Sequence, residues 1–205
     1  MLNLPIIASL ASFVSAITGL SPLCTVPENK CDALDVPTYM GDWYEIGATR
    51  LIRNTFESGC TCTTANYTLR TSDVSVENVC QKDNALNTVQ GKAVQLGPSE
   101  FKVTFPGGPI GDFFQNVVYN GPNYVVKNVW VDTNGNYRRA LVVSPKNGLI
   151  PDFVQKWFQS IWILSRDAVI DQSEIDEILE YVKQAGYDPE AAAWKSTART
   201  NCIRN

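Results

Sequence analysis

Short runs of strand-forming residues follow one another through most of the chain, and they limit its fold more than any other feature. Each run is rich in β-branched and aromatic residues or alternates apolar with polar ones, and Gly, Pro, Asn, Asp and Ser separate the runs. Short strands at nearly regular spacing are typical of β-sandwiches and β-barrels. The sequence therefore predicts one all-β domain with strands over residues 42–50, 61–70, 74–80, 88–96, 100–105, 115–120, 124–131, 137–143 and 161–166.

One amphipathic helix is predicted after the last strand, over residues 173–185. Ser173 and Asp176 resemble a capping box, and Gly186 stands where a glycine often ends a helix. The polar face of this helix is acidic, which favours packing on the outer wall of a sheet over a membrane or partner surface. Its apolar stripe consists of Ile175, Ile178, Leu179, Val182 and Ala185.

The N-terminus has the pattern of a targeting segment. Residues 4–17 are apolar, with small residues and serines interspersed, and Val14-Ser15-Ala16 provides the small residues that precede a signal-peptidase cut. We therefore expect a signal peptide over residues 1–16 and a single domain over residues 17–205. The segment before the apolar stretch lacks Lys and Arg, so an uncleaved anchor is the alternative. We expect the mature protein to be secreted.

Composition and charge exclude several classes of function. Seventeen basic residues stand against twenty-one acidic ones, a balance that argues against a nucleic-acid-binding surface. The chain has no histidine, which excludes Ser–His, Cys–His and zinc–His sites. We expect neither a metal nor a cofactor.

Six cysteines favour structural disulfides in a secreted chain. Cys60 and Cys62 lack the second pair or the histidine of a metal site, and thioredoxin-like redox motifs have two residues between their cysteines. Alternate residues of a strand point to the same face, so these two cysteines are expected to find separate partners. The residues alone leave the pairing open.

Three separated stretches resemble the lipocalin family, above all the apolipoprotein D and bacterial lipocalin type. They are GDWYEI at 41–46, NYRRALVVSP at 136–145 and IWILSR at 161–166, with weaker support from ANYTL at 65–69 and AGYD at 185–188. The resemblance covers about residues 35–200. It implies an eight-stranded antiparallel up-and-down β-barrel, closed at one end and open at the other, with the C-terminal helix packed on the outside.

The resemblance also implies how the closed end is held together. In this family the tryptophan of the first motif lies under the arginine of the last strand, here Trp43 and Arg166, and Gly41 opens the motif. A guanidinium group over an indole ring contributes about 0.5–2 kcal/mol. The contact would tie the first strand to the last, where a barrel closes.

One disulfide follows from the same resemblance. A cysteine just before Ala-Asn-Tyr is commonly joined to the C-terminal tail in this family, which implies the pair Cys62–Cys202. The other bond of the family would need a cysteine where this chain has Pro145. The N-terminal cysteines must then pair differently, and Cys60 and Cys80 are the available partners of Cys24 and Cys31.

Period-two alternation predicts which side chains point into the barrel. Asn66 begins an N-glycosylation sequon, and a glycan must lie outside, so Tyr67 should point inward together with Ala65 and Leu69. An inward Arg166 likewise places Trp162 inside, nearer the open end. An eight-stranded barrel is wide enough for one small ligand, although near the closed end the same pattern also fits ordinary core. The candidate ligand-binding residues are Tyr67, Trp162, Glu45, Phe101 and Phe105.

Three segments are expected near the open end. Residues 50–60 match the long first loop that covers the cup in the family, and residues 106–114 are rich in glycine. Residues 146–160 are longer than the tight turn usual in the family. This insertion either packs back as a short helix or contacts a membrane or partner without spanning the membrane, through Phe153, Trp157 and Phe158.

The resemblance implies a secreted protein that binds or transports a small hydrophobic ligand, such as a fatty acid, lysolipid, sterol, retinoid or pigment, rather than an enzyme. An enzyme acting on a lipid or pigment is the alternative, and it would require a free thiol or a pair of carboxylates in the pocket. A secreted partner-binding module is the third possibility.

Overall fold

The structure is a computed structural model that describes residues 21–24, 31, 34–106, 121–145, 152–157 and 159–203. The expected signal peptide, the expected strand over 115–120 and the side chain of Phe158 lie outside these residues.

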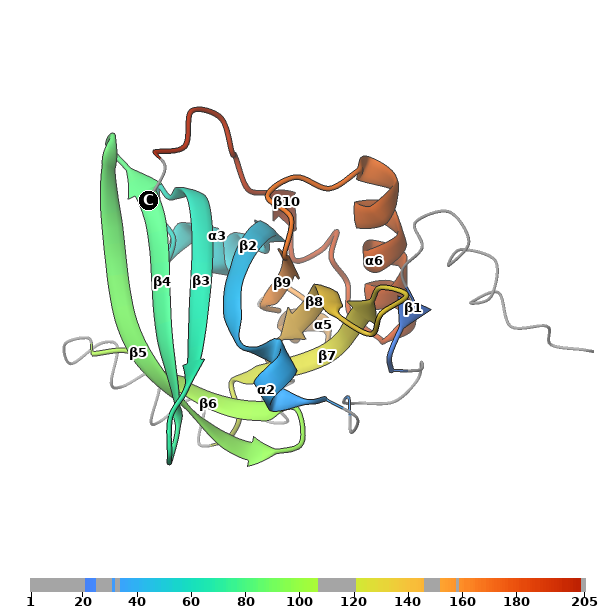
Figure 1. Cartoon of the computed structure of the whole chain (residues 1–205). Coiled ribbons are helices and arrows are strands. Elements are labelled where there is room, and N and C mark those ends of the chain that lie inside the picture. The colour runs from blue at the N-terminus through green and yellow to red at the C-terminus, as the bar shows by residue number, and fades with distance from the viewer. Residues whose placement is uncertain are drawn as a thin grey trace, which may run out of the picture.

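Eight antiparallel strands form a closed barrel (Figure 1). Each strand pairs with the next along the chain, and the first, β2, also pairs with the last, β9, which closes the barrel. This confirms the expected up-and-down barrel. The strands are β2 (Gly41–Ala48), β3 (Thr61–Leu69), β4 (Val74–Lys82), β5 (Ala85–Gly97), β6 (Glu100–Thr104), β7 (Tyr124–Val131), β8 (Tyr137–Val143) and β9 (Ile161–Ser165).

Short elements mark the two ends of the barrel. Helix α2 (Val36–Tyr39) precedes β2 at the closed end, and α3 (Arg50–Asn54) follows β2 at the opposite end, which we call the mouth (Figure 1). The connection from β8 to β9 also lies at the mouth and contains α5 (Asp152–Gln155). Strand β1 (Ser21–Pro22) pairs with the end of β7. The sequence patterns predicted none of these elements except a short helix in the β8–β9 connection.

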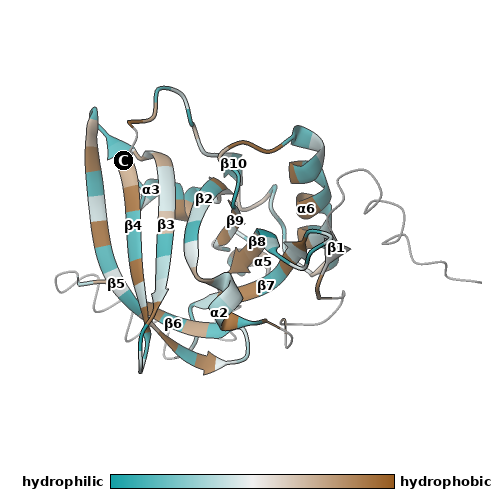
Figure 2. Cartoon of the chain, viewed as in Figure 1, coloured by the Kyte–Doolittle hydropathy of each residue, from teal (hydrophilic) through white to brown (hydrophobic). Residues whose placement is uncertain are grey.

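The barrel wall separates two apolar clusters because its strands alternate in side-chain direction, a pattern visible as changing colour along β4 and β5 in Figure 2. On β9, Trp162 and Leu164 face the interior, whereas Ile161 and Ile163 face outward. The outward cluster packs against helix α6 (Gln172–Gln184). Burying one such aliphatic side chain contributes about 1.5–3 kcal/mol, so this packing holds the helix on the barrel.

Helix α6 begins two residues earlier than the predicted capping box requires. Its N-cap is Asp171, and the backbone N–H of Asp171 donates to the Glu174 carboxylate at 3.2 Å. The predicted box of Ser173 and Asp176 is therefore wrong, because the longer glutamate reaches back to an N-cap three residues before it. Gly186, with φ of +83°, ends the helix as predicted.

Arg139 on β8 joins α6 to the barrel by ion pairs. Its guanidinium nitrogens lie 2.7 Å from an Asp167 oxygen and 2.9 Å from a Glu174 oxygen. The Arg139 side chain is only 7 % exposed, so burial protects these contacts from screening by solvent.

All six cysteines are paired, as Cys24–Cys31, Cys60–Cys80 and Cys62–Cys202. The Cys62–Cys202 bond is the one that the family resemblance implies. The expectation that Cys60 and Cys80 are the partners of the N-terminal cysteines is wrong. Cys60 directly precedes β3 and Cys80 lies on the neighbouring β4, where Thr61 is paired with Gln81, so these two cysteines are already adjacent.

The chain after α6 returns to the mouth and fills a gap between β2 and β3. The ladder between these strands ends at Tyr44 and Thr64, and residues 195–199, the tail segment, bind both strands beyond that point. Strand β10 (Lys195–Ser196) pairs with β2, and the Cys62 N–H donates to the Ala198 carbonyl at 2.8 Å. Gly47 permits this approach, because a Cβ there would lie 2.6 Å from the Lys195 carbonyl oxygen.

Candidate ligand-binding site

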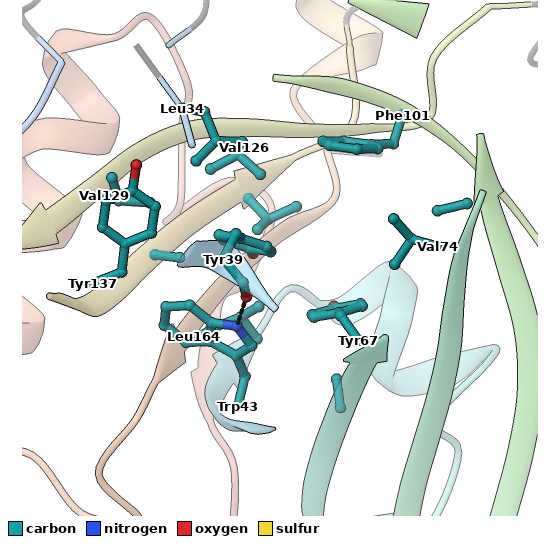
Figure 3. Close-up of a cluster of buried hydrophobic side chains, with 14 of the residues drawn as sticks. Leu34, Tyr39, Trp43, Tyr67, Val74, Phe101, Val126, Val129, Tyr137 and Leu164 are labelled. Carbon is teal, nitrogen blue, oxygen red and sulfur yellow. Dashed lines mark hydrogen bonds between the residues drawn. The ribbon is translucent and has the colours of Figure 1, made fainter. Parts of the chain in front are cut away.

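The closed end of the barrel is held by Trp43 and Arg166. Trp43 is fully buried, and the Arg166 guanidinium carbon lies 3.9 Å from the centroid of its ring system. The Trp43 indole N–H donates to the Tyr39 carbonyl at 2.8 Å (Figure 3). Gly41 adopts a φ of +91°, which favours glycine, next to the Arg166 side chain. Arg166 also donates to the main-chain carbonyls of Thr38, Tyr39, Met40 and Asp42.

Above this closed end, the aromatic candidates Tyr67, Phe101, Phe105 and Trp162 belong to or pack against one interior cluster, of which Tyr67 and Phe101 are labelled in Figure 3. Gly91 makes room for Phe105, because a Cβ at Gly91 would lie 2.6 Å from the Phe105 ring. Leu69 does not join them. It is 50 % exposed because the strand ends at this residue, although it lies opposite the interior residue Val74 and so keeps the inward direction that the alternation predicts.

Three tyrosine hydroxyls meet inside the barrel. The Tyr124 hydroxyl is 2.8 Å from that of Tyr39 and 3.0 Å from that of Tyr67. Burial raises the pKa of Tyr67 to about 12, and it raises the pKa values of the other two well above their ordinary value, so all three are neutral. Three hydroxyls carry three protons and two hydrogen bonds use two, so one O–H remains to donate elsewhere. Sequence reasoning missed Tyr39 and Tyr124.

Glu45 and Glu57 form a second polar group, which we call the acid pair, at the mouth. Glu45 points inward because it lies opposite the interior residue Leu164 in the β2–β9 ladder. Arg53 binds both carboxyls: its nitrogens are 3.1 Å from a Glu45 oxygen and 3.4 Å from a Glu57 oxygen. The two glutamate side chains are 4 % and 14 % exposed. Thr197 of the tail segment also donates to Glu45.

The acid pair holds a proton at neutral pH. Burial raises the pKa of Glu57 to about 9, and the negative charge of Glu45 and a hydrogen bond with it add to this effect, while Arg53 and Trp162 oppose it. After burial, the charges of both glutamates also contribute to the raised pKa of Tyr67. Sequence reasoning chose Glu45 but missed Glu57 and Arg53.

We expect Glu57→Gln to stabilise the protein increasingly as pH rises. The folded protein keeps a proton on Glu57 that the unfolded chain loses above its ordinary pKa of 4.5, so this group costs stability between that pH and about 9. The glutamine removes the titration, and the variant should be more stable than the wild type by about 1 kcal/mol or more near pH 8.5.

Urea unfolding at about pH 5, 7 and 8.5 measures this difference in the free energy of unfolding. Glu180→Gln, at an exposed position of α6, is the matched control and should show no such trend. A stability difference for Glu57→Gln that does not grow with pH would contradict a buried, protonated Glu57.

The mouth also carries exposed aromatic side chains. Phe56 after α3 is 70 % exposed, and Phe153 and Trp157 in the β8–β9 connection are 72 % and 48 % exposed. Gln155 and Gln159 of the same connection are buried, so the connection packs back on the barrel while Phe153 and Trp157 remain outside. Within the described ranges, no helix is long and apolar enough to cross a membrane.

Asn66 points out of the barrel, as its place next to the inward Tyr67 requires. Its side-chain amide donates to the Asp42 carboxylate at 2.7 Å, and Thr68 of the sequon donates to Asn66 at 3.1 Å. The outer position is compatible with a glycan. Glycosylation itself stays a prediction.

Comparisons with known proteins agree with this architecture. The family model described as a lipocalin-like domain matches residues 34–197. A protein of Acanthamoeba polyphaga mimivirus that is named as a lipocalin is 30 % identical over 157 residues, which cover 76 % of this chain and 80 % of that protein. The outer membrane lipoprotein Blc of Escherichia coli is 29 % identical over 191 residues, which cover 93 % of this chain and 95 % of Blc.

Among solved structures, lobster apocrustacyanin A1 has the same fold, with a TM-score of 0.57 and 16 % sequence identity. The match covers 90 % of this chain and 93 % of that one. The barrel, the Trp43–Arg166 contact and the outer helix are the features that the sequence motifs implied, and the family model spans the same residues. The chain therefore belongs to the lipocalin family.

Proposed function

We propose that the protein is an exported carrier that binds one small hydrophobic molecule inside the barrel. The observation that carries this proposal is the interior cluster, which is aliphatic and aromatic from the closed end upward and ends in a few polar groups near the mouth. Apolar surface that a ligand buries against such a wall contributes about 25 cal/mol per Å². Polar groups at one end then orient the ligand.

In this proposal the wall is formed by Tyr67, Phe101, Phe105 and Trp162, and Glu45 belongs to the polar end. Trp162 is the most informative of them, because it is only partly buried in the interior and stands nearest the mouth. Fatty acids, lysolipids, sterols, retinoids and pigments are all compatible with such a wall.

Export is supported by the three disulfides, which persist in oxidising compartments, and by the apolar N-terminal residues 4–17. The relative from Escherichia coli is named as an outer membrane lipoprotein, which is also an exported protein. We propose cleavage after Ala16, secretion, and a glycan on Asn66 as parts of the same route.

Native mass spectrometry of the protein from its secreting cell, followed by lipid extraction, should find one bound molecule per chain. In solution, the apolar dye N-phenyl-1-naphthylamine should bind, and Trp162→Ala should weaken its binding about fivefold or more, a loss of about 1 kcal/mol of contact energy. Trp157→Ala removes an exposed tryptophan outside the interior and is the matched control. A protein that takes up no lipid, retinoid or pigment would refute the carrier proposal.

An enzyme is the second candidate, and the acid pair is the observation that favours it. The route through a free thiol is excluded, since all six cysteines are in disulfides. Two neighbouring carboxyls, of which Glu57 has a raised pKa, can act as acid and base. We favour the carrier, because Arg53 and Thr197 both bind Glu45 and hold this carboxyl in place. Recovery of the natural ligand in chemically unchanged form would distinguish the two candidates.

A further inference from the structure

The three tyrosine hydroxyls inside the barrel, which we call the tyrosine triad, have one donor to spare. The hydroxyl of Tyr124 lies between the other two, 2.8 Å from that of Tyr39 and 3.0 Å from that of Tyr67. Whichever way these two bonds point, one O–H group is left without an acceptor among the described residues. Tyr39 and Tyr67 are only 2 % and 7 % exposed. A buried donor without an acceptor costs free energy, which a ligand oxygen would recover.

The triad lies within the aromatic wall of the interior. The ring of Tyr39 is 5.0 Å from that of Trp43 at the closed end, where both are labelled in Figure 3. On the other side, the ring of Tyr124 is 6.3 Å from that of Phe101 and 6.4 Å from that of Trp162. Tyr124 and Trp162 pack against the interior cluster but are only partly buried, so the other side chains do not cover them fully. A ligand that covers these rings is within reach of the hydroxyls.

The charges around the triad favour a neutral group over a carboxylate. A phenol is uncharged at neutral pH. Arg166 is the cation that acts on both Tyr39 and Tyr67, and its guanidinium already lies over Trp43 and donates to main-chain carbonyls. A carboxylate at the triad would therefore be buried without a cation of its own among the described residues, which is costly. A carbonyl oxygen needs only one donor, and the triad offers one.

We propose that the tyrosine triad binds the polar end of the ligand, and that this end carries a neutral hydrogen-bond acceptor, the oxygen of a ketone or aldehyde. This inference rests on the proposed carrier function, because the apolar part of the ligand must lie along the wall of the barrel. The spare O–H of the triad donates to the carbonyl oxygen, and no covalent bond changes. Such a ligand is a neutral lipid or pigment rather than a fatty acid.

Three probes of similar chain length test the proposal by displacing N-phenyl-1-naphthylamine at neutral pH. They are methyl nonyl ketone, its alkene isostere, in which a methylene group replaces the carbonyl oxygen, and undecanoate. The triple variant Tyr39→Phe, Tyr67→Phe, Tyr124→Phe removes the hydroxyls and keeps the rings. We expect it to bind the ketone about tenfold more weakly relative to the alkene, because the buried carbonyl loses its donor. The affinity for undecanoate should not change, since its carboxylate stays away from the triad.

The infrared stretching frequency of the bound ketone carbonyl reports the hydrogen bond directly. It should be lower in the wild-type protein than in a hydrocarbon solvent, and this comparison does not depend on the folding of any variant. The triple variant should restore the solvent value. Tyr137→Phe is the matched control: this side chain also belongs to the interior cluster, but its hydroxyl accepts from the Asp35 N–H at 2.8 Å. It should leave both the frequency and the affinity for the ketone unchanged.

The outcomes separate this inference from the carrier function. If the ketone bound to the wild type has the frequency that it shows in hydrocarbon, or if ketone and alkene lose affinity equally in the triple variant, the inference is overturned and the carrier function stands. Undecanoate that loses as much affinity as the ketone would identify the triad as an anion site and would also overturn it. If neither the dye nor any of the three probes binds, the carrier function itself fails.

Discussion

Replacing both Cys62 and Cys202 by alanine is expected to lower the free energy of unfolding by about 3–5 kcal/mol. The bond joins residues 140 positions apart, so it removes a large amount of chain entropy from the unfolded state. It also fixes the tail segment against β3 at the mouth. Denaturant unfolding without reductant measures the loss.

The matched control is the double replacement of Cys60 and Cys80, whose bond closes a separation of only 20 residues. The chain-entropy relation gives about 3 kcal/mol for that length, so the control should lose less stability than the first variant. If the two variants lose equal stability, or the control loses more, chain entropy is not the main contribution of the long-range bond.

Arg166→Ala is expected to lower the free energy of unfolding by about 2–4 kcal/mol, because it removes the cation–π contact with Trp43 and several hydrogen bonds to main-chain carbonyls. Trp43 is fully buried in the native protein, and loss of the guanidinium opens one face of its ring. The emission of Trp43 should therefore move to longer wavelength and become more accessible to a soluble quencher.

The other four tryptophans would mask this signal, so each spectrum is taken as the difference from the same protein with Trp43→Phe. Arg166→Lys is the matched control: it keeps the charge but lacks the planar fork that reaches several carbonyls, and it should recover only part of the stability. An unchanged midpoint of unfolding together with unchanged emission would place Trp43 and Arg166 outside the closing contact.

The strands and the outer helix could be predicted because their signals are local. Side chains alternate along a strand and recur every three to four residues along a helix, so a short window of sequence contains the pattern. The start of the helix is not fixed by a local pattern, since Ser173 with Asp176 and Asp171 with Glu174 both fit a capping box. Only the packed structure selects between them.

The polar groups of the site could not be predicted, because they depend on residues far apart in the sequence. The hydroxyls of Tyr39 and Tyr124 meet across 85 positions, and Thr197 reaches Glu45 across 152. Contacts between residues so far apart leave no periodic pattern in the sequence from which they could be predicted. Glu57 and Arg53 lie in a segment that was expected only to cover the mouth, and nothing in their spacing indicates that both would turn toward Glu45.

The tail segment has a consequence for self-association. Where β2 and β3 diverge, each would present unpaired main-chain N–H and C=O groups to another molecule, and exposed edges of this kind are templates for intermolecular strand pairing. Residues 195–199 occupy both edges, and the Cys62–Cys202 bond keeps them there. In a reducing compartment the same chain would lose that restraint, so the disulfide protects the barrel from aggregation as well as from unfolding.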